Sequence, residues 1–196
     1  MAIQSLCAKI FNGLDVSCAK PVSKYYQQAV IINKSDIDDY DLNLPDAETE
    51  TCAYTVEFSL KPGTTGYRIL GAEAGSSFYG SAAKTRSDLG YAQYVHNVGI
   101  LIAGLSEEAK CILDGLDKGS FVIALQAKDG TVEIFGIVNG LTTGDYEYNI
   151  QEGGGGTQII LSSLEDAPES TLPLVYESAV PGQESEDFDD AFAVGS

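Results

Sequence analysis

The sequence predicts a mainly β fold, a two-sheet β-sandwich or small barrel with one flanking α-helix. Several short runs of β-branched and aromatic residues are separated by glycine-rich turns. A single segment shows apolar residues at helical spacing. No apolar run approaches the roughly 20 residues that a membrane span needs. A chain of 196 residues can bury a substantial core in one domain, so this pattern favours packed β layers with one helix against them.

The predicted strands are runs rich in Val, Ile, Thr and aromatic residues. The clearest pair flanks Lys128-Asp129-Gly130, because Asp-Gly between two such runs is a strong hairpin signal. A second turn is expected at Asn139-Gly140. The segment Tyr91–Ala103 alternates along its length and predicts a long strand that is partly covered on both faces. The strands are expected at Gln28–Ile32, Cys52–Leu60, Arg68–Gly71, Tyr91–Ala103, Phe121–Ala127, Thr131–Val138, Tyr146–Ile150 and Thr157–Leu161.

The one predicted helix follows the long strand. Ser106 is a plausible N-cap, and the acids Glu107 and Glu108 occupy the first turn, where the helix dipole favours negative charge. Lys118 lies in the last turn, and Gly119 ends the helix. The apolar face is expected to consist of Ala109, Ile112, Leu113 and Leu116.

Three segments predict loops. Asn33–Glu50 is acidic and contains Pro45, whereas Gly75–Gly90 is small and polar, with basic residues at Lys84 and Arg86. The four glycines Gly153 to Gly156 predict a flexible tip. We expect residues 1–22 to form an N-terminal arm, residues 23–168 a β-rich domain, and residues 169–196 an acidic C-terminal extension.

The extension differs in composition from the rest of the chain. Leu172–Tyr176 is expected to dock on a neighbour. The end of the chain is acidic and carries Phe188 and Phe192. Such a segment is either disordered in water or a docking tail, and both interpretations stand.

The chain is strongly acidic. Eleven Lys and Arg oppose 29 Asp and Glu, which gives a formal net charge of -18. No Lys or Arg lies between Lys34 and Lys61, and none follows Lys128. Such a protein repels DNA and anionic membranes, so its expected partners are basic surfaces or copies of itself. The acidic segments are either solvated loops or a face that is kept negative.

The candidates for catalysis or metal binding are few. His96 is the one histidine, and inside a strand it predicts a packed or hydrogen-bonded side chain in preference to a base. The cysteines lack zinc-site spacing. With no visible secretory signal, we expect free thiols and synthesis in a reducing cytoplasm, although Cys7 and Cys18 could pair in an oxidising medium. The cysteines are Cys7, Cys18, Cys52 and Cys111.

The acidic run Asp36–Asp41 departs from the calcium loop of an EF-hand. Tyr40 stands at a ligand position, Asp41 replaces the turn glycine, and Ala47 replaces the bidentate Glu. A looser acidic metal site stays open. Neither Lys-Ser/Thr nor a helix follows Gly153 to Gly156, which excludes a phosphate-binding loop. The sequence therefore predicts no enzyme, no catalytic residue, no cofactor and no metal.

The order of several motifs resembles a family of structural proteins from tailed bacteriophages of Bacteroides-type bacteria, which are similar to the tail-tube fold. The resemblance covers roughly Cys18 to Pro168. The motifs that carry it are Cys18-Ala19-Lys20-Pro21, Ile31-Ile32-Asn33-Lys34-Ser35-Asp36-Ile37, Val95-His96-Asn97-Val98-Gly99-Ile100, Leu113-Asp114-Gly115-Leu116-Asp117-Lys118-Gly119, Phe121-Val122-Ile123-Ala124, Phe135-Gly136-Ile137-Val138-Asn139-Gly140-Leu141, Thr157-Gln158-Ile159-Ile160-Leu161 and Ala167-Pro168.

The resemblance implies a two-sheet β domain with one helix that self-assembles into a homo-oligomeric ring, six- or twelve-fold, or into a tube. The location it implies is the tail or neck of a virion assembled in the bacterial host cytoplasm. Its partners would be copies of itself and other tail, neck or portal proteins, with no membrane. DNA would pass during genome ejection without specific binding, because acidic walls repel phosphate.

Two other function classes remain open. A β-sandwich on a phage or cell surface could bind carbohydrate or a receptor through exposed aromatic residues. The candidates are Tyr25, Tyr26, Phe78 and Tyr79, and packing in a core or a subunit interface is the preferred interpretation of these four. The third class is a cysteine- or carboxylate-dependent hydrolase.

Overall fold

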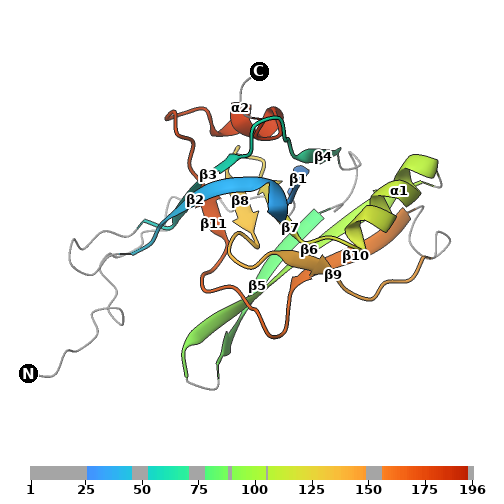
Figure 1. The fold of residues 1–196 in the computed structure, drawn as a ribbon, viewed down its shortest axis with the longest axis horizontal. Helices are drawn as coiled ribbons and strands as arrows, with labels where there is room; N and C mark the ends of the chain where they lie inside the picture. Colours follow the sequence, from blue (N-terminus) through green and yellow to red (C-terminus); the bar gives the residue numbers. More distant parts are fainter. Residues whose placement is uncertain are drawn as a thin grey trace, which may run out of the picture.

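The computed structural model describes residues 26–45, 53–70, 78–87, 90–104, 106–148 and 156–193. The described residues form eleven strands in one mixed sheet and two α-helices, so the predicted mainly β class is confirmed (Figure 1). The sheet is open and does not close into a barrel, and it carries a second helix that the sequence did not predict. The predicted arm, residues 1–22, lies outside the described residues, as does the tip Gly153–Gly155.

The elements have the following bounds along the chain. The strands are β1 (Gln28–Asn33), β2 (Ile37–Asn43), β3 (Thr55–Leu60), β4 (Tyr67–Leu70), β5 (Phe78–Arg86), β6 (Ala92–Ala103), β7 (Phe121–Gln126), β8 (Val132–Phe135), β9 (Leu141–Thr143), β10 (Gly156–Ser163) and β11 (Leu174–Tyr176). The helices are α1 (Glu107–Leu116), α2 (Glu184–Asp189) and a 3₁₀ turn at Lys34–Asp36.

The strand order is β2-β3-β11-β8-β7-β9-β10-β6-β5, and β1 pairs with both β7 and β4. Every pairing between named strands is antiparallel except that of β11 with β3. Residues 144–148 have no regular structure, so the alternating segment Tyr146–Ile150 forms no strand in its described part. The strand nearest to this segment is β9, which ends at Thr143.

The strands β1 and β7 are buried on both faces. All six residues of β7 are buried, and so are the four central residues of β1. Their side chains alternate between two separate cores: Ala29 and Ile31 point to one, and Val30 and Ile32 point to the other. A continuous apolar run is the pattern expected of a strand that is covered on both sides.

The two cores are formed by different parts of the sheet. The α1 core includes Phe78, Val98, Ile100, Leu113, Leu116, Ile123, Phe135, Leu141, Ile159 and Leu161. The α2 core includes Val56, Phe58, Leu60, Val122, Ile134, Leu174, Tyr176, Phe188 and Phe192. β5, β6 and β10 therefore cover one face of the central strands, and β3 and β11 cover the other. The sandwich consists of one sheet that bends back over both of its own faces.

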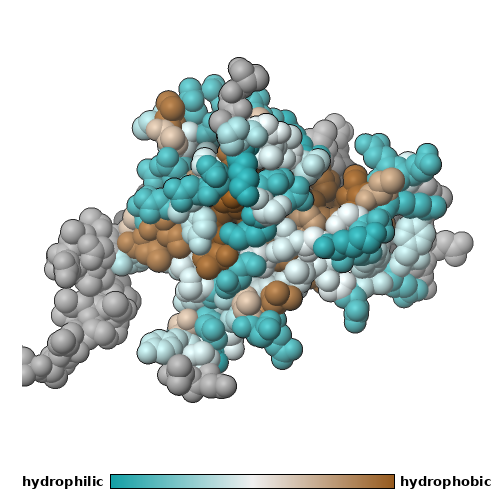
Figure 2. All heavy atoms as spheres, viewed as in Figure 1, coloured by the Kyte–Doolittle hydropathy of each residue, from teal (hydrophilic) through white to brown (hydrophobic). Residues whose placement is uncertain are grey.

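The helix α1 begins where predicted, but it ends at Leu116, so Lys118 lies beyond its last turn. The Ser106 Oγ accepts a hydrogen bond from the Ala109 N–H at 3.2 Å, which confirms the N-cap. Ala109, Leu113 and Leu116 are buried in the α1 core, but Ile112 is 38% exposed. The outward face of α1 is hydrophilic (Figure 2).

The prediction that Asn33–Glu50 and Gly75–Gly90 form loops is wrong for part of each segment, because each contains a strand at the edge of the sheet. β2 lies within Asn33–Glu50 and pairs with β3, and it directs Ile37 and Leu42 toward the α2 core. β5 lies within Gly75–Gly90 and pairs with β6 over nine residues. Its small residues have low strand propensity, but Gly80 fits under the ring of Phe135, where an added Cβ would come within 2.4 Å of the ring.

The C-terminal segment, residues 169–193, packs on the chain's own core. β11 inserts between β3 and β8, and α2 buries Phe188 completely. The ring of Phe192 lies 4.9 Å from that of Phe58 and 5.0 Å from that of Tyr176, measured between centroids. Neither alternative describes the part of this segment that the structure shows, because it is ordered within the chain's own α2 core. Leu174 and Tyr176, which were expected to dock on a neighbour, are buried in that core.

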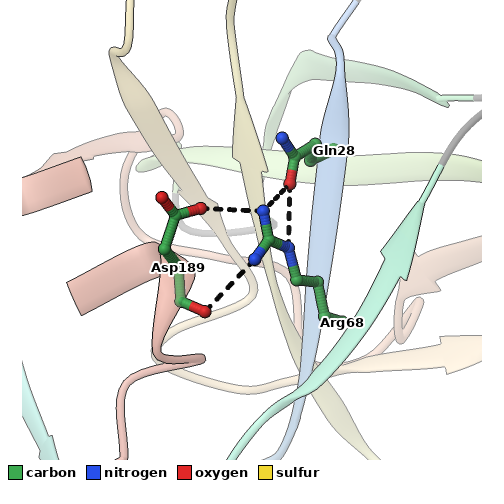
Figure 3. Close-up of polar contacts among 3 residues, drawn as sticks. All are labelled: Gln28, Arg68 and Asp189. Carbon is green, nitrogen blue, oxygen red and sulfur yellow. Dashed lines mark hydrogen bonds and ion pairs between the residues drawn. The ribbon is translucent and has the colours of Figure 1, made fainter. Parts of the chain in front are cut away.

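One side chain joins α2 to the central strands. The Arg68 guanidinium, on β4, donates to the Gln28 side-chain oxygen on β1 and forms an ion pair with Asp189 at 2.7 Å (Figure 3). It also donates to the Asp189 carbonyl at 3.3 Å. Because the pair is partly exposed, it orients the helix more than it stabilises it.

The Phe188→Ala variant tests whether the C-terminal segment is part of the folding unit. Removing a fully buried ring is expected to lower the free energy of unfolding by about 3–5 kcal/mol. Denaturant titration measures this loss. The matched control is Tyr91→Ala, because Tyr91 is 71% exposed and its loss should change stability by less than about 0.5 kcal/mol. Equal stability of the two variants would contradict the packing of α2.

Candidate functional site

His96 lies on β6 with 1% of its surface exposed, and both ring nitrogens are engaged. Nε2 lies 2.8 Å from the Thr171 carbonyl, and Nδ1 accepts the Gly136 N–H at 3.2 Å. The ring is therefore neutral, with its proton on Nε2. Burial lowers the pKa of His96 below its ordinary value, against the effect of the Thr171 carbonyl. The prediction of a packed, hydrogen-bonded histidine is confirmed.

Glu169 is the buried acid that the sequence did not single out. Its carboxylate is fully buried and accepts the N–H groups of Val138 at 3.1 Å and Asn139 at 2.8 Å. Burial raises the pKa of Glu169, although these N–H groups and the charge of Lys34 act in the opposite direction. Nothing local marks this residue, because the groups it binds lie about thirty positions earlier in the chain.

Three side chains, Lys34, His96 and Glu169, hold the turn at residues 136–140, and we call them the turn clamp. The Lys34 ammonium donates to the Ile137 carbonyl, while the other two bind backbone N–H groups of the turn. The backbone of Glu169 also pairs with Tyr94 through bonds of 2.8 and 2.9 Å. The His96 and Glu169 side chains bind backbone groups, and the Lys34 ammonium, which also lies 4.9 Å from the centroid of the Tyr40 ring, binds a backbone carbonyl, so the arrangement supports the fold.

The remaining chemical candidates are not brought together. Cys111 is free and exposed on α1, and the partners of the His96 ring are backbone groups, not a thiol. Cys7, Cys18 and Cys52 lie outside the described residues. The acids Asp38, Asp39 and Asp41 follow one another along the extended strand β2. Within the described ranges, no group of three or more His, Cys, Asp or Glu could hold a metal ion.

The three described residues of the candidate aromatic binding site do not form one exposed cluster. Phe78 is 1% exposed and belongs to the α1 core, which is the packing interpretation. The Tyr26 hydroxyl donates to Glu133, and the ring packs against the same core. The Tyr79 ring covers Gly99 on the neighbouring strand. Tyr25 lies outside the described residues.

A groove of about 620 Å³ lies between α1 and β4, with apolar side chains gathered there (Figure 2). Its lining includes Ile69, Cys111 and Ile112, with Arg68 and Glu108 as its charged residues. The Arg68 guanidinium already binds Gln28 and Asp189. The groove therefore lacks convergent free polar groups that would orient a reacting substrate.

The strand order begins at β2 and finishes at β5, and each of these strands has one neighbour. β2 pairs with β3 on one side and β5 pairs with β6 on one side, and no other described strand pairs with their outer edges. Residues 38–41 of β2 and residues 83–86 of β5 are exposed. The β5–β6 hairpin extends beyond the body of the molecule (Figure 1). An unpaired edge of this kind is a template for another strand.

The two edges differ in charge. β2 carries Asp38, Asp39 and Asp41 and no base, whereas β5 carries Lys84 and Arg86 and no acid. The sequence had indicated both charge clusters but had placed them in loops. Because they lie on strands, their charges repeat at regular spacing along a bonding edge.

Comparison of this chain with family models, curated proteins and solved structures found no match. Neither α1 nor α2 has the length and apolar character of a membrane-spanning helix, and the described chain holds no other candidate. Among the described residues, the features on which a function can be argued are the unpaired outer edges of β2 and β5.

The pH dependence of stability tests the state of His96. Its pKa is lowered in the folded protein, so its contribution to stability is complete above its ordinary value of 6.5 and is lost as the pH falls below that value. His96→Gln removes the titration, and the free energy of unfolding should fall less steeply in this variant between about pH 7 and 5. Glu169, with the opposite slope, is present in both proteins and cancels from the difference. Parallel profiles would contradict a buried neutral His96.

The Glu169→Ala variant tests the turn clamp. Two partly buried N–H groups lose their acceptor, so the free energy of unfolding is expected to fall by about 2–4 kcal/mol. Chemical denaturation provides the measurement. Glu165→Ala, an exposed acid four residues earlier, is the matched control and should leave stability within about 0.5 kcal/mol of wild type. A loss as small as the control's would show that the clamp is dispensable.

Proposed function

We propose that this chain is a structural, non-enzymatic subunit that assembles with its own copies into rings or a tube in the tail or neck of a tailed bacteriophage. The observation that carries the proposal is the open sheet, whose terminal strands β2 and β5 each leave an outer edge without a partner in the described chain. The proposed location is supported by the resemblance of the motif order in Cys18 to Pro168 to that of tail-tube proteins.

The length of these edges supports assembly. β5 has nine residues and β2 has seven, and both are long enough to add a strand from another molecule. β4, the other strand with a single partner, has only four residues, and its Arg68 is engaged with α2. Ring closure would cover the long edges of every copy at once.

The charge of the chain supports a role as a conduit. At a formal net charge of -18, the surface repels phosphate, so DNA could pass without being retained. The one histidine supports a structural role, because it serves to hold a turn. Other tail, neck or portal proteins would be the neighbours of such a ring.

The proposal predicts that the purified full chain forms rings or tubes. Negative-stain microscopy and sedimentation velocity across a range of concentrations would detect them, and the assemblies should not retain duplex DNA at physiological salt. A protein that stays monomeric at the highest soluble concentration would overturn the proposal. Retention of DNA would overturn the conduit role.

A further inference from the structure

We infer that copies of this chain join head to tail through strand pairing between the acidic outer edge of β2 on one copy and the basic outer edge of β5 on the next. The inference rests on the proposed function and names the contact that would build the ring. The two edges lie at opposite ends of the strand order, so one copy can use both at once.

The charges on these edges are available for a partner. The ion pairs among the described residues are Arg68–Asp189 and Lys118–Asp114, and neither involves β2 or β5. The edge residues are also exposed, so ion pairs with a second copy would not require the fold to rearrange. The exposed charges are Asp38, Asp39 and Asp41 on β2, and Lys84 and Arg86 on β5.

The charges also project from the same face of the sheet. On β3, Val56 and Phe58 point into the α2 core, so Asp41, which is opposite Glu57, lies on the other face, as does Asp39. On β5, Lys84 and Arg86 alternate in phase with Phe78, which lies in the α1 core. These two cores occupy opposite faces of β1 and β7. On the central strands, the face away from the α2 core is the face toward the α1 core. The two acids on β2 and the two bases on β5 therefore project from this same face of the continuous sheet.

The spacing along the strands also matches. Asp39 and Asp41 are two residues apart, as are Lys84 and Arg86, so each pair repeats at about 6.6–6.8 Å along its strand. When β2 of one copy extends the sheet beside β5 of the next with matching faces, both carboxylates can lie opposite both cations. With matching faces the two strands run antiparallel, because seven of the eight pairings that connect β2 to β5 in the strand order are antiparallel.

The charge pattern selects against other pairings. Two β2 edges would set acids opposite acids, and two β5 edges would set bases opposite bases, which is unfavourable for directly opposed residues. A two-fold dimer through either edge is therefore disfavoured. The β2–β5 contact joins different surfaces of the two copies, and a contact of this type builds a ring or a filament.

The test uses two charge-reversal variants of the full chain. The first is Asp39→Lys with Asp41→Lys, and the second is Lys84→Glu with Arg86→Glu. Each gives a copy whose two edges have like charge, so each alone should associate at least about tenfold more weakly than wild type in sedimentation. The four side chains are exposed, and unchanged thermal unfolding of each variant would show that the fold is intact.

Mixing the two variants makes the test specific. In an equimolar mixture, each edge of one variant meets an oppositely charged edge of the other, so assemblies should return and contain an even number of subunits. Two controls change the net charge equally at exposed residues away from β2 and β5: Glu165→Lys with Asp166→Lys, and Lys110→Glu with Lys128→Glu. Both controls should assemble as wild type does.

The outcomes separate the two proposals. Weak assembly of each variant alone, with recovery on mixing, supports the edge contact. If wild type assembles but the reversed variants assemble equally well, or if mixing restores nothing, the β2–β5 contact is overturned and the proposed function stands. A wild-type chain that never assembles overturns both.

Discussion

The strands β1 and β7 lie at the centre of the fold and direct apolar side chains into a core on each of their two faces. An apolar strand of this kind must be covered twice, and in this chain the cover comes from the same sheet. β5, β6 and β10 bend over one face together with α1, while β3 and β11 bend over the other together with α2. The requirement for two covers explains why the sheet is long, and why it needs both helices.

A sheet that bends in two opposite directions does not bring its ends together. In a barrel, the first and last strands meet and remove the edges. Here β2 ends on the side of the α2 core and β5 on the side of the α1 core, so each keeps an unpaired edge. The same constraint that builds the core thus leaves β2 and β5 with unpaired outer edges, and in the proposed assembly their opposite charges would give the contact a direction.

The turn clamp links these two halves. The turn at residues 136–140 lies between β8, which borders the α2 core, and β9, which leads into the α1 core. Lys34, His96 and Glu169 reach it from three separate segments and satisfy its backbone groups. Polar residues that would suggest chemistry in isolation serve to fix the path of the chain, since a buried N–H or carbonyl without a partner is costly.

The sequence by itself determined the elements whose signal is local: β1, β3, the long strand β6, the capped helix α1, and the hairpin of β7 and β8 around Asp129-Gly130. In each, propensity, capping or turn chemistry agrees with the final structure. It could not show that Asn33–Glu50 and Gly75–Gly90 contain strands, because acids and small residues form strands only where a neighbour supplies the hydrogen bonds. The hydrogen bonds of Glu169 and the burial of Phe188 also depend on the tertiary structure, since the residues that they contact lie far away in the chain. The sequence shows the acids of β2 and the bases of β5. Their position on one face at equal spacing follows only from the pairing of β2 with β3 and of β5 with β6, since pairing makes these segments extended strands.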